Sequence, residues 1–199
     1  DSDCSVVTPT DCYPLGEHRA STSGATIEGF GGGFLGSDVS ALGDWDGDLF
    51  DDLAISADGS SHVYLINGPV AGNWDLTNPD RFRCRLAVNY PQAKLGEVLL
   101  GGEDWNEDEM PDLLIGANRW SEGSFPNPGA VFMLFGGEDS FDCSETLNLD
   151  YEDQDYTAGG HIRITGESHN AQLGSAISVV PDVSGDGRAE LLLGASGDN

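Results

Sequence analysis

The chain has 199 residues, which is enough for one or two domains with a sizeable core. It carries 35 acidic residues against 8 Lys and Arg, a net charge of −27. A surface this negative repels nucleic acid and anionic membranes, and therefore excludes a polyphosphate partner. The longest apolar run, residues 130–135, is far too short to cross a bilayer, so no membrane span is expected.

Taken in chain order, the sequence divides into an irregular start and a series of similar units. Residues 1–24 hold two Cys, two Pro and clusters of Ser, Thr and Gly, and are expected to be irregular. A stray strand follows at about 25–29. Three units then occupy about 34–88, 94–166 and 172–196.

Each unit begins with an apolar strand, an acidic loop and a second strand. The first two units continue with a turn, a third strand, a long connection and a fourth strand, and the connection at 139–160 is an acidic insertion. The inner strands are nearly continuous apolar runs, which suits sheets covered on both faces. No stretch shows helical periodicity. The sequence therefore predicts an all-β fold across 25–199: a β-propeller-like array of four-stranded antiparallel blades, with two blades and a half blade.

The first acidic loop has oxygen side chains at every second position, at Asp44, Asp46 and Asp48, and Asp52 closes it. Such a loop can turn its carboxylates inward around one hard cation. Ca²⁺ fits best, because it accepts six to eight oxygens in flexible geometry, whereas Mg²⁺ keeps its waters and transition metals prefer nitrogen or sulfur. Phe50 is expected to lend its backbone carbonyl.

The same spacing returns in the second and third units, in the same register between apolar strands. The candidate ligands of the second loop are Asp104, Asn106, Asp108 and Asp112, with the backbone carbonyl of Met110. Those of the third loop are Asp182, Ser184, Asp186 and Glu190, with the backbone carbonyl of Arg188. A solvated turn does not explain three matching loops, so the sequence predicts about three calcium ions.

These loops and their flanks resemble the FG-GAP repeat of integrin α-subunits and secreted bacterial proteins. The family pattern is Phe-Gly, a strand, a calcium loop of the form D-x-[DN]-x-[DN]-G-x-x-D, and a strand ending in Gly-Ala-Pro. Leu-Gly stands for Phe-Gly at residues 35–36, 95–96 and 173–174, and the final Pro is absent. The sixth loop position is Leu49, Glu109 and Gly187, where the family has Gly. The resemblance implies a calcium-binding β-propeller.

The four cysteines, Cys4, Cys12, Cys84 and Cys143, have no CxxC spacing, and three pairings are open. Cys4 with Cys12 and Cys84 with Cys143 is the local choice. Disulfides and millimolar calcium both favour an extracellular or cell-surface setting, and we expect that a leader has been removed before Asp1.

Catalysis is not expected, because the paired carboxylates sit where they already satisfy a cation and no nucleophile elbow occurs. Trp45 and Trp105 follow the first acid of two loops, and packing is the favoured interpretation over sugar stacking. The expected function is a non-catalytic extracellular structural or adhesion module. The alternative is a carbohydrate-binding propeller, or the propeller appendage of a larger secreted enzyme, with glycans as partners.

The array does not close into a ring within this sequence. One account is that the chain is a fragment of a longer propeller. The other is head-to-tail self-assembly, in which residues 1–28 of one molecule complete the third blade of the next and give a ring or a filament. The partners expected are thus other copies of the chain or other extracellular proteins.

Overall fold

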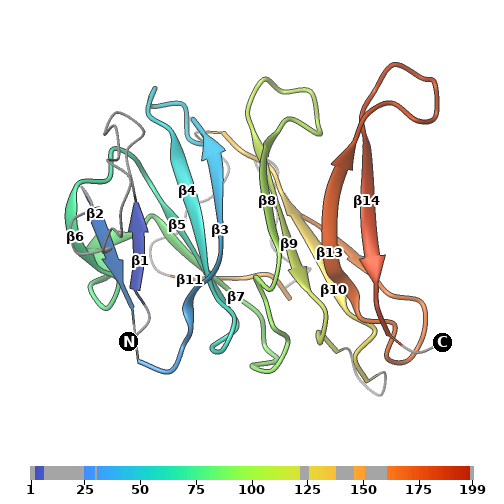
Figure 1. The fold of residues 1–199 in the computed structure, drawn as a ribbon, viewed down its shortest axis with the longest axis horizontal. Coiled ribbons are helices and arrows are strands. Elements are labelled where there is room, and N and C mark those ends of the chain that lie inside the picture. Colours follow the sequence, from blue (N-terminus) through green and yellow to red (C-terminus); the bar gives the residue numbers. More distant parts are fainter. Residues whose placement is uncertain are drawn as a thin grey trace, which may run out of the picture.

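The computed structural model of the protein describes residues 3–6, 25–29, 31–121, 126–137, 146–150 and 161–197, and the backbone alone for 3–6. The described residues form an all-β structure of several sheets, none of them closed, in which one 3-10 turn (η2, Pro79–Arg81) is present and no α-helix. The sheets stand side by side in chain order from β1 to β14 (Figure 1). No helix of the described part is long and apolar enough to span a membrane.

The first complete unit forms one sheet. Its strands are β3 (Leu35–Gly43), β4 (Asp52–Ala57), β5 (His62–Ile66) and β7 (Cys84–Ala87), each antiparallel to its neighbour. A fifth strand, β11 (Thr146–Asn148), joins this sheet parallel to β7. The expectation of strand, loop, strand, turn, strand, connection and strand is confirmed for this unit.

The second unit repeats the arrangement. Its four-stranded antiparallel sheet consists of β8 (Leu99–Glu103), β9 (Asp112–Ala117), β10 (Ala130–Leu134) and β12 (His161–Thr165). Every residue of β9 and β10 is buried. Their continuous apolar sequence follows from this burial, because a neighbouring sheet covers each face.

Two smaller sheets flank these. After the second unit, β13 (Leu173–Val180) and β14 (Glu190–Ala195) form an antiparallel pair. Before the first unit, β1 (Asp3–Val6), β2 (Ala25–Glu28) and β6 (Gly72–Asp75) form a three-stranded sheet. Residues 3–6, which we expected to be irregular, pair as β1 with β2, so the stray strand has a neighbour on each edge. The rest of 1–24 lies outside the described residues.

The long connections between third and fourth strands cross to the preceding sheet. β6 pairs parallel with β2, and β11 pairs parallel with β7. The residue after each added strand repeats the same bond, since Leu76 N donates to Glu28 O and Leu149 N to Ala87 O, both at 2.8 Å. Part of the connection that we expected to be an insertion, 139–160, is therefore a strand that ties two sheets together.

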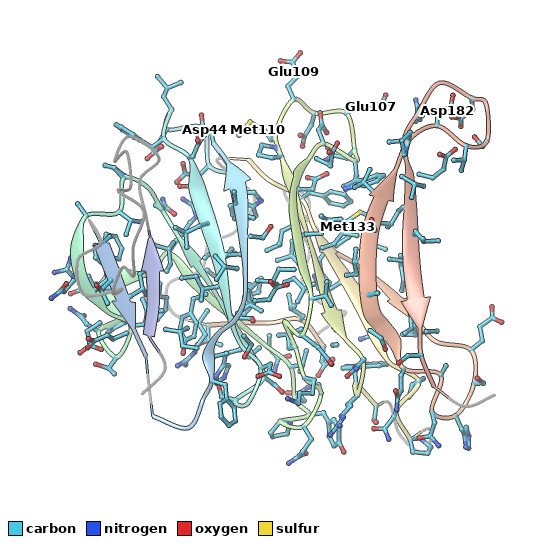
Figure 2. The ribbon with its side chains drawn as sticks, viewed as in Figure 1. Asp44, Glu107, Glu109, Met110, Met133 and Asp182 are labelled. Carbon is cyan, nitrogen blue, oxygen red and sulfur yellow. The ribbon has the colours of Figure 1, made fainter. Side chains whose placement is uncertain are left out.

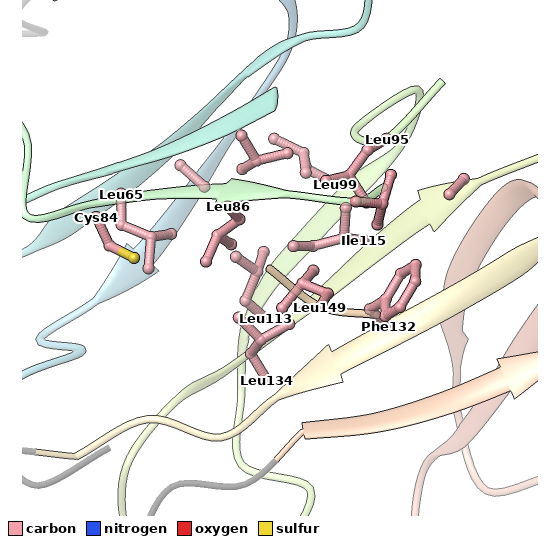
Figure 3. Close-up of a cluster of buried hydrophobic side chains, with 14 of the residues drawn as sticks. Leu65, Cys84, Leu86, Leu95, Leu99, Leu113, Ile115, Phe132, Leu134 and Leu149 are labelled. Carbon is pink, nitrogen blue, oxygen red and sulfur yellow. The ribbon is translucent and has the colours of Figure 1, made fainter. Parts of the chain in front are cut away.

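Apolar side chains fill the spaces between neighbouring sheets. The largest cluster lies between the β3–β4–β5–β7 sheet and the β8–β9–β10–β12 sheet, and includes Leu65, Leu86, Ile115 and Phe132 (Figure 3). A second cluster joins β2 and β6 to the first unit, and a third joins the second unit to β13 and β14. The apolar side chains of these clusters thus pack between a sheet and the one before or after it.

The Leu-Gly motif lies where one sheet meets the preceding one. A Cβ on Gly96 would come 2.5 Å from Ser56 Cβ, and a Cβ on Gly174 would come 2.5 Å from Ala130 O. Both glycines also have positive φ, at 84° and 90°. Glycine is required here because a side chain would push the two sheets apart.

Candidate metal centres

The three acidic loops lie at the same end of neighbouring sheets, after β3, β8 and β13. Figure 2 shows Asp44, Met110, Glu109, Glu107 and Asp182 at this end. Neighbouring loops also touch: Arg188 Nη2 in the third loop lies 2.6 Å from Glu107 Oε1 in the second. The strand pairings place the loops here, because each loop joins the first two strands of its sheet.

All three loops share one set of internal hydrogen bonds. The acid that closes the loop accepts from the N–H of the residue after the first acid: Trp45 to Asp52 at 3.0 Å, Trp105 to Asp112 at 2.7 Å and Val183 to Glu190 at 2.8 Å. The first acid accepts from the sixth position: Leu49 to Asp44 at 3.0 Å, Glu109 to Asp104 at 2.9 Å and Gly187 to Asp182 at 2.8 Å. These bonds turn the first and last acids of each loop inward.

The fifth position repeats as well. Asp48, Asp108 and Asp186 each accept from the N–H two residues later, of Phe50, Met110 and Arg188, at 2.9 Å in every case. The N–H groups of these three residues thus bind the fifth acid of each loop, and ligation by their carbonyl oxygens stays a prediction.

The backbone of the loops is also the same. The fourth position has positive φ in Gly47, Glu107 and Gly185, and the sixth in Leu49, Glu109 and Gly187, at 75°, 73° and 90°. The sixth position therefore has the conformation that favours glycine, even where the sequence has Leu or Glu. The loss of glycine there does not change the geometry of the loop.

The first loop gathers its acids most clearly. Carboxylate oxygens of Asp44, Asp46 and Asp48 lie within 4.8 Å of one another. Asp44 Oδ1 is buried and has no hydrogen-bond partner in the structure. A buried carboxylate oxygen without a partner is costly, and a cation among these three acids would remove that cost.

Two residues of this loop's surroundings could not be predicted from the acidic spacing. Arg83 Nη1 donates to Asp46 Oδ2 at 2.8 Å, and Asn67 Nδ2 donates to the same oxygen. Asn67 directly follows the third strand and Arg83 directly precedes the fourth, so both reach the loop only because the sheet brings them together.

A glycine after the third strand also contacts the acid that closes each of the first two loops, and the acidic spacing does not predict it. Gly68 N donates to Asp52 Oδ1 at 2.8 Å, and Gly136 N donates to Asp112 Oδ1 at 3.0 Å. A Cβ at either glycine would come within 2.4 Å of a loop carbonyl oxygen, of Asp51 or Pro111. The signal in the sequence is a glycine two residues after the third strand in both units.

The second and third loops differ in how their side chains gather. In the second, Asn106 Nδ2 donates to Asp108 Oδ2 at 2.8 Å, and its acids are not among the described groups of three acids within 4.8 Å of one another. In the third, Asp182, Asp186 and Glu190 do form such a group. Ser184 contributes its N–H to Glu190 Oε1 at 2.9 Å.

The pKa values differ with burial. Burial raises the pKa of Asp52 and of Asp112 above the ordinary range, although two backbone N–H groups on each oppose this, and the neighbouring acids raise it further. In the exposed third loop, the N–H groups of Gly187 and Gly185 lower the pKa of Asp182, and bonds from Ser184 and Val183 lower that of Glu190. The first two loops thus hold carboxylates whose charge is unfavourable without a counter-ion.

Trp45 packs in the core with 1 % of its surface exposed, and Trp105 packs against the third cluster. The packing interpretation is confirmed for Trp45.

Cys84 is disulfide-bonded. The described side chains do not include its partner, so the pairings stay a prediction.

A comparison with models of known protein families gives no match for the chain, and a comparison with curated proteins gives none either. The assignment of the loops therefore rests on their own geometry and chemistry.

Proposed function

We propose that the protein is a non-catalytic calcium-binding module in which each acidic loop holds one Ca²⁺. The observation that carries the proposal is the recurrence of one loop geometry with acids at its first, fifth and ninth positions. Oxygen donors of mixed type in a flexible loop suit Ca²⁺ better than Mg²⁺ or a transition metal. Modules of this kind hold Ca²⁺ at about 10⁻⁴–10⁻³ M, which suits an extracellular setting.

The role proposed for the ion is to stiffen the end of each sheet. The loop joins the first two strands, and its closing acid also binds the start of the connection after the third strand, through Gly68 or Gly136. One ion would therefore hold three strands of a sheet in register. The proposed architecture is an array of propeller blades of the FG-GAP type, in which calcium-stiffened sheets serve a structural or adhesive purpose.

The proposal is tested by calcium calorimetry on the full chain, with magnesium as the comparison. We expect about three calcium ions to bind and magnesium to bind more weakly. Asp44→Asn, which keeps the size of the side chain and an acceptor for Leu49 N, is expected to remove one of them. The proposal is wrong if the wild-type chain takes up no calcium or if Asp44→Asn leaves the stoichiometry unchanged.

We also propose head-to-tail assembly of the chain, which requires contacts of the N-terminal strands to be broken. Exchange of residues 1–28 would have to break the pairing of β2 with β6, and to remove Ile27, which is fully buried, from its present core. Sedimentation over a range of concentrations tests it. A mass that stays at one chain at every concentration would exclude assembly and would leave the calcium proposal untouched.

A further inference from the structure

The strongest feature outside the acidic loops is a cavity of about 310 Å³ between β5, β7 and the glycine-rich turn after β2. Its polar lining comes from Ser60, His62, Tyr64 and Arg85, and backbone of Gly31–33 forms another wall. This is the size of a pocket for a small organic molecule, and a few convergent polar groups are typical of such pockets.

Arg85 is the charged side chain among the described residues that line this cavity. Its Nε and Nη2 donate to the hydroxyl of Thr146 at 3.0 and 2.7 Å. Within the described part of the chain it forms no ion pair, whereas Arg83, Lys94, Arg163 and Arg188 each do. Arg85 is half-buried and also hydrogen-bonds the side chain of Tyr64, so its described side-chain partners are hydroxyl groups and include no carboxylate.

The second unit has an arginine at the position equivalent to Arg85, and that arginine is paired with a carboxylate of the chain itself. Arg85 pairs with Tyr64 across β5 and β7, and Arg163 pairs with Phe132 across β10 and β12, so the two arginines are equivalent. Arg163 has a carboxylate of its own, since its Nη1 lies 3.9 Å from Asp150 Oδ1.

An aromatic ring covers that second arginine. The guanidinium of Arg163 lies 4.7 Å from the centre of the Trp120 ring, and Trp120 Nε1 donates to Asp150 Oδ1 at 2.7 Å. Trp120 is 3 % exposed and packs edge-on against Phe132. Arginine, carboxylate and indole thus form a filled site.

The first unit has neither the indole nor the carboxylate at the equivalent positions. Ser60 takes the place of Trp120, because Ser60 N donates to Ala57 O as Trp120 N does to Ala117 O, at 3.0 and 2.9 Å. Thr77 takes the place of Asp150, one residue after the equivalent Leu76 and Leu149. The cavity is lined by Ser60 and Arg85, and the second unit has an indole beside its arginine at the equivalent positions.

We propose that this cavity, lined by Ser60, His62, Tyr64 and Arg85, binds a small carboxylate-bearing molecule whose carboxylate pairs with Arg85 as Asp150 pairs with Arg163. Burial lowers the pKa of His62, and the charge of Arg85 lowers it further, so the imidazole adds no charge near pH 7 and serves as a neutral hydrogen-bonding group. Tyr64, which is buried and packs edge-on against Phe82, gives the ligand an aromatic wall. The site is separate from the acidic loops and does not depend on calcium ligation.

The carboxylate could belong to an acidic sugar or to the end of a peptide, and the experiment separates these sources. Binding to the full chain is measured by calorimetry in calcium for methyl glucuronoside and for an acetylated dipeptide with a free C-terminus. The controls are methyl glucoside and the dipeptide amide, which lack the charge. We expect one acid to bind and its neutral analogue not to bind.

Three variants locate the binding. Arg85→Gln keeps donors but removes the charge, and is expected to weaken binding by about tenfold or more, as for loss of a charge-assisted bond. Ser60→Trp is expected to fill the cavity and abolish binding. Arg81→Gln, at an exposed arginine that stacks on Trp74 at 5.4 Å, is the matched control and is expected to bind as the wild type does.

Thermal melting of each variant establishes that it folds. If Ser60→Trp does not fold, Arg85→Gln alone tests whether the acid binds in this cavity. The proposal is overturned if neither acid binds, if the neutral analogues bind equally well, or if Arg85→Gln binds as tightly as Arg81→Gln. Loss of calcium binding in the same preparations would overturn the proposed function instead, so the two failures are distinguishable.

Discussion

Arg83 Nη1 lies 2.8 Å from Asp46 Oδ2, so a permanent positive charge contacts the second ligand position of the first acidic loop. The two residues come from opposite ends of the sheet's sequence and are both largely buried, with 24 % and 7 % of their side chains exposed. The first loop has the largest number of candidate carboxylate ligands, Asp44, Asp46, Asp48 and Asp52, and Arg83 offsets the charge of one of them.

Removal of that charge is expected to strengthen calcium binding at the first loop. Arg83→Gln keeps a hydrogen-bond donor for Asp46 but leaves the full negative charge to the ion, and we expect affinity to rise by about two- to tenfold. Calorimetry at low ionic strength measures the change. The same substitution at Arg81, which has no contact with the loop, is the control, and weaker binding in Arg83→Gln would show that Arg83 positions Asp46 instead.

Calcium is expected to stabilise the fold. A site occupied at 100 times its dissociation constant adds about 2.7 kcal/mol, and for a chain of this size each 1 kcal/mol raises the melting temperature by about 2–4 °C. Asp44→Asn should lower the melting temperature in calcium, and a chelator should remove most of the difference between variant and wild type. An unchanged wild-type melting curve in chelator would mean that the loops do not serve stability.

At the sixth loop position, a change to glycine is expected to leave the stability nearly unchanged, whereas a change from glycine to another residue is expected to lower it. Gly187→Ala should cost about 1–2 kcal/mol, because φ is 90° there and an L side chain is strained in that region. Leu49→Gly should cost less than about 0.5 kcal/mol, because Leu49 is 89 % exposed and relief of strain offsets the entropy of the new glycine. Urea unfolding of both variants in calcium measures the difference, and equal losses would contradict the assigned backbone.

The contact of Gly96 with the preceding sheet gives a packing test. Gly96→Ala places a methyl group 2.5 Å from Ser56 Cβ at a φ of 84°, and we expect a loss of about 2–4 kcal/mol. Gly31→Ala is the control for stability, since its Cβ meets nothing within 4 Å and its φ is not positive. Similar unfolding free energies for the two variants would show that the sheets do not pack here as described.

A pH dependence is expected from Asp58, which pairs with Lys94 of the next unit and accepts from Ser37 Oγ at 2.6 Å. Burial raises the pKa of Asp58, but the bonds from Lys94 and Ser37 and the charge of Lys94 outweigh this and hold it below its ordinary value of 3.8. A lowered folded-state pKa means that the stabilisation is fully present above the unfolded pKa and is lost as pH falls through the folded one.

Asp58→Asn should therefore cost about 1 kcal/mol near pH 7 and progressively less in acid below about pH 4. Urea unfolding at a series of pH values, compared with the wild type, measures this. A constant difference across the acid range would show that the Asp58 charge contributes nothing.

The sequence by itself determined the parts that depend on local pattern. Alternating oxygen side chains predicted the acidic loops, and the continuous apolar runs of β9 and β10 predicted strands covered on both faces. The matching fourth strands, β7 and β12, followed from comparison of the units. These features can be read locally because a strand or a tight loop is specified by residues only a few positions apart.

Only the tertiary structure decided which distant residues meet. β11 leaves its own unit to pair with β7, and its side chain at Thr146 reaches Arg85. Arg83 and Asn67 reach Asp46 through the folded sheet. No local pattern marks such contacts, because they depend on how neighbouring sheets pack. For the same reason, the sequence does not reveal that Ser60, at the position equivalent to Trp120 in the second unit, lies beside a cavity lined by Arg85.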